Sequence, residues 1–138
     1  MAEGDDIMTK KQLQGYGWLQ KSIQRLEEKV LELRTAAEKM TMTLSGELRN
    51  ASPERDKIAN VIAKIMDVEK LLKEQLHESY ILLEEIEKAI SKLPEREQYL
   101  IRARYIDCRN WEEIGIDMGY AWAQIHRIHS KALKILAG

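Results

Sequence analysis

Residues 93–136 read LPEREQYLIRARYIDCRNWEEIGIDMGYAWAQIHRIHSKALKIL. Pro94 favours the start of a helix, because its missing N–H would have no partner in the first turn in any case. Gly119 follows a short apolar run, and glycine tolerates the left-handed conformation that ends many helices. We therefore predict a helix from Pro94, a short helix over 111–118, a glycine-led turn and a last helix over 122–137. Two helices joined in this way make a helix-turn-helix.

The predicted last helix is amphipathic with a period of 3.6 residues. We expect its apolar face to pack on a core; the members of that face are Ile125, Ile128, Ala132, Ile135 and Leu136. From Ala121 onward the chain holds the cations Arg127, Lys131 and Lys134 and no Asp or Glu. A helix-turn-helix presents such a face to the major groove. The sequence therefore predicts double-stranded DNA as the partner.

The side chains near the start of this helix are the ones that reach base edges. Gln124 can form a two-point contact with adenine, and Arg127 can form a bidentate contact with guanine. Trp122, Ala123 and His126 flank them and complete the predicted base-reading set. Residues further along position the helix on the backbone. The predicted phosphate contacts are Ser130, Lys131 and Lys134.

The first part of the chain predicts a long helical hairpin. From Leu19 to Leu44 the apolar residues alternate at spacings of 4 and 3, which is the period of a coiled coil. The periodicity then stops, and we expect residues 44–52 to form the loop that reverses the chain. Ser52 and Pro53 favour the start of a second helix that runs to about residue 92. The predicted fold class is all-α, with a long antiparallel, coiled-coil-like hairpin followed by the helix-turn-helix.

This pattern predicts two parts with different tasks. Residues 1–92 would be the hairpin and dimerisation region, and residues 93–138 would be the DNA-binding domain. The apolar stripe on the second helix is wider than one partner helix would cover. Either two hairpins pack together or the C-terminal domain folds back on the stripe. We expect a homodimer through the long helices.

Composition excludes several classes of protein. The 138 residues include 22 Lys+Arg and 23 Asp+Glu, and this balance excludes a histone-like nonspecific binder. Cys108 is alone, so an internal disulfide and a zinc site with several thiolates are excluded. His126 and His129 have a spacing compatible with a metal, but no third ligand is near. We therefore expect no metal and no cofactor.

The chain shows no sign of catalysis or of a membrane segment. The sequence shows neither a nucleophile paired with a base nor a phosphate-binding loop, so we do not expect the protein to be an enzyme. No apolar run approaches the roughly 18 to 20 residues of a membrane helix, and the start, MAEGDDIMTKK, lacks the apolar region of a secretory signal. We expect a cytoplasmic protein that does not bind a membrane.

Several motifs resemble known proteins in the order in which they occur. LPEREQYLIRARY, WEEIGIDMG and KALKIL occupy the places of the motifs of region four of bacterial sigma factors. Further segments are similar to small sigma-like proteins of Gram-positive phages and prophages: Gly17–Leu26, Thr43–Gly46, Ala63–Glu69, Arg104–Ile114 and Arg127–Leu133. The resemblance implies a phage-type transcription regulator that binds DNA and touches RNA polymerase as region four does.

The chain also departs from region four. Its last helix starts with Ala121, Trp122, Ala123 and Gln124 in place of a Ser-like cap and several arginines, so promoter specificity does not carry over. The sigma region that melts promoters has no counterpart, so a complete initiating sigma factor is not expected. Two alternatives stay open. One is a small terminase-like subunit of DNA packaging whose long helices build a ring, and the other is an adaptor that docks on polymerase without binding DNA.

Overall fold

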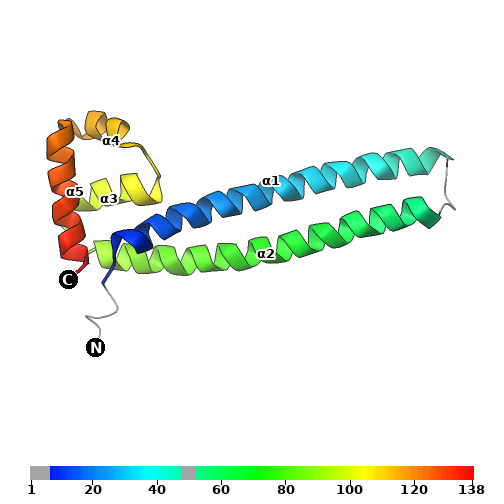
Figure 1. Ribbon diagram of the computed structural model, residues 1–138, viewed down its shortest axis with the longest axis horizontal. Coiled ribbons are helices and arrows are strands. Elements are labelled where there is room, and N and C mark those ends of the chain that lie inside the picture. Colours follow the sequence, from blue (N-terminus) through cyan, green and yellow to red (C-terminus); the bar gives the residue numbers. More distant parts are fainter. Residues whose placement is uncertain (1–6, 48–51) are drawn as a thin grey trace. The chain divides into compact units, whose positions relative to one another are not determined.

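The computed structural model describes residues 7–47 and 52–138, apart from the side chains of residues 44–54. This part of the chain forms helices, in the order α1 (Lys10–Glu47), α2 (Ser52–Ile90), α3 (Glu95–Ile101), the π-helical turn η2 (Arg102–Ile106), α4 (Trp111–Met118) and α5 (Trp122–Leu136). α1 and α2 run side by side in opposite directions (Figure 1). The predicted all-α class is therefore confirmed. No described helix is both long enough and apolar enough to span a membrane.

The contacts divide the chain into two compact units. Unit 1 joins the described residues up to Gln20 with Glu78–Gly138, and unit 2 is Lys21–His77. The first turns of α1 and the end of α2 therefore pack with the C-terminal helices. This is one of the two arrangements that the wide apolar stripe predicts. The assignment of dimerisation to residues 1–92 and of DNA binding to residues 93–138 stays a prediction.

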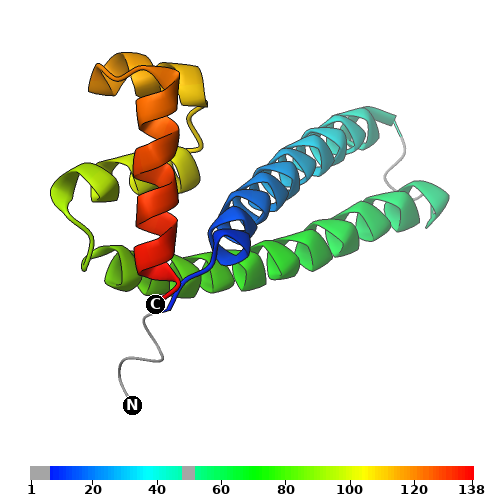
Figure 2. The same ribbon diagram turned by 60° about the vertical axis from the view of Figure 1, so that its left-hand side comes forward.

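Unit 1 is built around one apolar core. α5 lies across α3, and its C-terminal end lies beside the start of α1 and the end of α2 (Figure 2). The Met8 N–H donates a hydrogen bond to the carbonyl oxygen of Leu136 at 2.9 Å, which ties the N-terminal segment to the end of α5. The buried apolar residues of this core are Met8, Leu13, Tyr16, Ile86, Ala89, Ile90, Leu93, Leu100, Ile101, Ala103, Tyr105, Ile114, Ile125, Ile128, Ala132 and Leu136.

The start of α1 lies well before the coiled-coil period begins. Thr9 and Gln12 form a capping box, in which the Gln12 N–H donates to Thr9 Oγ1 at 3.2 Å and the Thr9 N–H donates to Gln12 Oε1 at 2.8 Å. The next turns bury Leu13 and Tyr16 in the core of unit 1. The early part of the helix is thus held by a cap and by tertiary packing, neither of which depends on a heptad pattern.

Two predicted boundaries differ from the observed ones. Residues 44–47, expected in the loop, continue α1; Ser and Gly weaken a helix by only about 0.5 to 1 kcal/mol each and do not end it alone. The remainder of the predicted loop, up to residue 51, lies outside the described residues. Pro94 is the N-cap of α3, with an extended ψ of 155°, so the helix proper begins at Glu95.

Unit 2 is a pair of helices with little interior. Arg34 Nη2 donates a hydrogen bond to Glu69 Oε1 at 2.7 Å, from α1 to α2. Among the described side chains of this unit, Ile23 alone is buried, and the others are half-buried or exposed. The apolar residues between the two helices are therefore only partly buried and do not form a closed core.

Candidate nucleic-acid interface

α4, the turn at residues 119–121 and α5 form the helix-turn-helix. The Asn110 side chain caps α4 by accepting a hydrogen bond from the Glu113 N–H at 2.8 Å. Gly119 ends α4 with a φ of 72°, a left-handed conformation that glycine adopts without strain. The predicted short helix over 111–118 and the predicted start of the last helix at Trp122 are both confirmed.

The turn packs closely against both helices. A Cβ atom on Gly115 would lie 3.2 Å from the carbonyl oxygen of Tyr120, so this glycine allows the turn to contact α4 directly. Ala121 is the N-cap of α5 and has no side-chain acceptor. Its N–H instead donates to Gln124 Oε1 at 3.0 Å. Gln124 therefore helps to hold the helix start and can offer a base its second oxygen lone pair and its two N–H donors.

The outer face of α5 carries most of the predicted contact residues in exposed positions: Ala123, Gln124, Arg127, Ser130, Lys131 and Lys134. Trp122, in the first turn, is 71% exposed. Not one of the α5 cations forms an ion pair with a described residue. By contrast, Arg102 pairs with Glu87 at 2.6 Å and Arg109 pairs with Asp117 at 3.2 Å. The α5 cations are thus available to phosphates.

His126 is less exposed than the other predicted contact residues of α5. Its ring centroid lies 4.0 Å from that of Trp122 and 4.8 Å from that of Trp111, so the imidazole packs between two indoles. Its Nε2 atom is buried and has no hydrogen-bond partner among the described residues. The ring therefore supports Trp122 at the start of α5, and contact with a base edge would require Nε2 to be uncovered first.

His129 lies on the buried side of α5. The Tyr105 hydroxyl lies 2.6 Å from His129 Nε2. Burial, followed by the charges of Lys10, His126 and Arg104, lowers the pKa of His129 to about 4. The ring is therefore neutral at neutral pH, and its polar contact is internal. The described part of the chain contains no group of three or more His, Cys, Asp or Glu side chains arranged to hold a metal ion.

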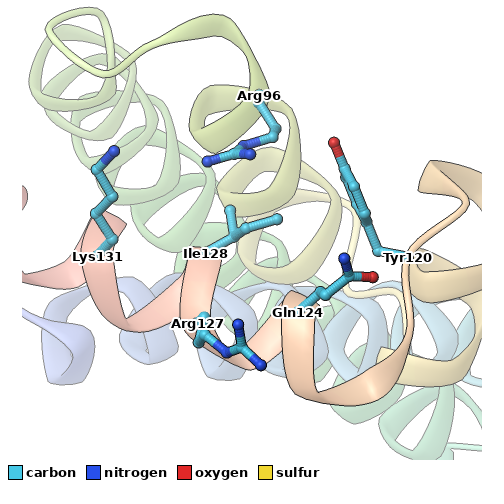
Figure 3. A pocket seen from close by; sticks show the side chains of 6 residues that line it. All are labelled: Arg96, Tyr120, Gln124, Arg127, Ile128 and Lys131. Carbon is cyan, nitrogen blue, oxygen red and sulfur yellow. The ribbon is translucent and has the colours of Figure 1, made fainter.

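A groove beside α5 adds two residues that sequence reasoning missed, Arg96 and Tyr120. It has a volume of about 260 Å³ and is also lined by Gln124, Arg127, Ile128 and Lys131. Figure 3 shows Arg96 and Lys131 on one side of Ile128 and Arg127 on the other. Cationic and hydrogen-bonding groups of this kind suit a phosphate. The groove therefore extends the cationic surface from α5 to α3.

A buried carboxylate fixes Arg96 in this groove. Glu97 is 1% exposed and accepts a hydrogen bond from Arg96 Nη2 at 2.7 Å. Burial acts to raise the pKa of Glu97, but hydrogen bonds from Arg96 and the backbone, with the charges of Arg96 and Lys131, outweigh it and lower that pKa. Hydrogen bonding with Glu97 and then with Tyr120 raises the pKa of Arg96. The sequence signal was the Arg-Glu pair in LPERE, but its position before the helix-turn-helix gave no reason to place it beside α5.

Comparison with known proteins agrees with this geometry. Residues 89–137 match the model of the sequence family described as Sigma-70, region 4. The match includes α3, η2, α4 and α5. No curated protein and no solved structure matches the chain. The C-terminal region is a sigma region-four helix-turn-helix, which indicates DNA binding in transcription.

Proposed function

We propose that this protein is a cytoplasmic transcription regulator of phage or prophage origin that binds specific double-stranded DNA as a homodimer. The observation that carries the proposal is the exposed outer face of α5, whose cations are free of ion pairs with described residues and adjoin the groove at Arg96. The match of residues 89–137 to sigma region four supports DNA binding and contact with RNA polymerase. The resemblance to small sigma-like phage proteins supports the origin.

Base reading falls to the first turns of α5. Arg127 forms a bidentate contact with guanine, and Gln124 uses its N–H donors and its second oxygen lone pair on adenine. Ala123 and Trp122 contribute apolar contacts in the same groove, where the exposed indole packs on sugar or a thymine methyl group. His126 acts mainly by holding Trp122 in place, as the distance of 4.0 Å between their ring centroids suggests.

Phosphate contacts flank this region. Lys131, Lys134 and Ser130 lie further along α5 and bind the backbone of the duplex. Arg96 adds a contact from α3, since Glu97 holds its guanidinium beside the groove. The N-terminus of α5 has no acidic residue in its first turn, so its positive helix end also favours a phosphate.

Arg127→Ala and Lys134→Ala distinguish base reading from phosphate contact. A preferred duplex is selected from random-sequence DNA, and its affinity and that of a scrambled duplex are measured by fluorescence anisotropy at several salt concentrations. Arg127→Ala should lose roughly 5- to 150-fold in affinity for the preferred duplex and little for the scrambled one, because a bidentate contact contributes about 1–3 kcal/mol. Lys134→Ala should weaken both duplexes alike and reduce the salt slope by about one.

Two further variants complete this experiment. Arg96→Ala should behave like Lys134→Ala, and Lys64→Ala, which removes an exposed cation of unit 2, should leave both affinities unchanged. Equal losses on the two duplexes for Arg127→Ala would contradict base reading by this residue. A wild-type chain that binds no duplex would contradict the proposed function and favour the polymerase-docking adaptor, whereas a large closed ring in sedimentation would favour the DNA-packaging subunit.

A further inference from the structure

Gln124 has two tasks at the start of α5. Ala121 is the N-cap of the helix and has no side-chain acceptor, so Gln124 supplies the side-chain part of the cap. The Ala121 N–H donates to Gln124 Oε1 at 3.0 Å. Gln124 is nevertheless exposed and lines the groove beside α5. The same side chain therefore caps the helix and borders the proposed DNA contacts.

The capping bond fixes which end of the amide faces the groove. A backbone N–H can donate only to an acceptor, so the end of the amide beside Ala121 is the oxygen and not the NH2 group. The amide nitrogen points away from this bond. Figure 3 shows Nε2 of Gln124 directed into the groove, towards the space between Ile128 and Tyr120. Gln124 therefore offers its two N–H donors to a ligand in the groove.

The surroundings of this amide also favour an acceptor. Arg96, Arg127 and Lys131 line the same groove, and their side chains carry donors but no acceptors. A ligand atom that enters beside Nε2 of Gln124 is therefore placed among positive charges and N–H groups. On the major-groove edge of adenine the atom that suits this position is N7, an acceptor, whereas the N6 amino group is a donor.

We infer that Gln124 recognises adenine by donating a hydrogen bond from Nε2 to N7, while Oε1 remains bonded to the Ala121 N–H. The inference rests on the proposed function, in which Gln124 contacts adenine, and adds the atom that is read. The second lone pair of Oε1 then adds little, because turning the amide towards the N6 group would break the capping bond. Since the cap already holds the side chain, binding of the base costs less side-chain entropy.

Two analogues of adenine separate the donor contact from the oxygen contact. 7-Deazaadenine lacks the N7 acceptor, and unsubstituted purine lacks the N6 amino group. Each analogue replaces every adenine of the preferred duplex in turn, and the affinity of the full chain is measured by fluorescence anisotropy. At one adenine, 7-deazaadenine should cost the wild-type chain about 3- to 12-fold in affinity, and purine should cost less than about twofold. Gln124→Ala should lose the response to 7-deazaadenine at that adenine.

Gln124→Glu exchanges the donor for an acceptor and keeps the cap. Its carboxylate can still accept from the Ala121 N–H, and a negative charge is favourable at a helix N-terminus. The variant should therefore keep the urea midpoint of the wild-type chain, whereas Gln124→Ala should lower it. Because a carboxylate accepts from the N4 amino group of cytosine, the preference for adenine over cytosine at this position should fall by about tenfold or more. Gln24→Glu, which places the same charge on an exposed position of unit 2, should leave that preference unchanged.

Three results would overturn the inference. They are a loss with purine that exceeds the loss with 7-deazaadenine, the absence of any adenine at which 7-deazaadenine acts through Gln124, and an unchanged preference for Gln124→Glu. These results are distinguishable from failure of the proposed function. A wild-type chain that selects a preferred duplex but gives one of the three results contradicts the inference alone, whereas a chain that binds no duplex contradicts the function on which the inference rests.

Discussion

The two units bury their apolar side chains to different extents. In unit 1, turns of α1 and α2 share a core with the three C-terminal helices, and Leu13, Ile86 and Ile90 are fully buried. In unit 2 the same two helices continue, yet Ile23 is the only buried residue among the described side chains. The comparison teaches that apolar periodicity shows which face of a helix is apolar. It does not show whether another part of the protein buries that face.

The largest expected effect comes from core substitutions in the two units. Leu100 in unit 1 is fully buried, and Leu33 in unit 2 is half-buried. Leu100→Ala should lower the free energy of unfolding by about 2–5 kcal/mol, because it leaves a cavity, and Leu33→Ala should cost less than about 2 kcal/mol. Urea titrations measure both values.

The three tryptophans make this measurement specific to one unit. Trp18, Trp111 and Trp122 all lie in unit 1, so their fluorescence reports that unit, whereas far-UV circular dichroism reports helices in both. In the wild-type chain at low concentration, the dichroism should begin to fall at lower urea than the fluorescence. Coincident transitions together with equal losses for the two variants would remove the distinction between the units.

The second effect depends on pH and belongs to unit 1. The pKa of His129 is about 4 in the folded chain against an ordinary value of 6.5. Between these values the unfolded chain binds a proton that the folded chain excludes, so stability falls as the pH is lowered from about 6.5 towards 4. This difference corresponds to roughly 3 kcal/mol when the transition is complete.

Comparison with a variant that does not titrate isolates this effect. His129→Gln keeps a polar group beside Tyr105 but cannot take up the proton. Between pH 7 and pH 4.5 the wild-type chain should lose about 2–3 kcal/mol more than the variant, as followed by tryptophan fluorescence in urea. Parallel pH profiles would show that His129 is protonated as readily in the folded chain as in the unfolded one.

Local signals explain which parts of the fold could be predicted. Gly119 and the amphipathic pattern of α5 predict the helix-turn-helix, because both signals depend only on residues that are close in the sequence. The groove could not be predicted, since Arg96 comes from α3 and Tyr120 from the turn, and they meet only through tertiary packing. For the same reason the helical pattern placed His126 beside the predicted base-reading residues without showing that it packs against Trp111 of α4.

The smallest expected effect concerns ion pairs, in which the two units should be alike. Arg34–Glu69 in unit 2 has side chains 59% and 43% exposed, and Arg102–Glu87 in unit 1 has side chains 40% and 41% exposed. Double-mutant cycles to alanine should give coupling energies of about 0.2–1 kcal/mol for each pair, and these should shrink at high salt. A much larger value for one pair would mean that the units also differ in how they desolvate charge.

The hydrogen bond between Met8 and Leu136 has a consequence for how the molecule is made. Met8 and Leu13 are synthesised before α3, α4 and α5, the helices with which they share the core of unit 1. A nascent chain therefore cannot complete this interior until α5 has been synthesised. A polypeptide truncated before α5 would leave the apolar side chains of the first turns of α1 without part of their core, and we expect proteases to cleave it readily.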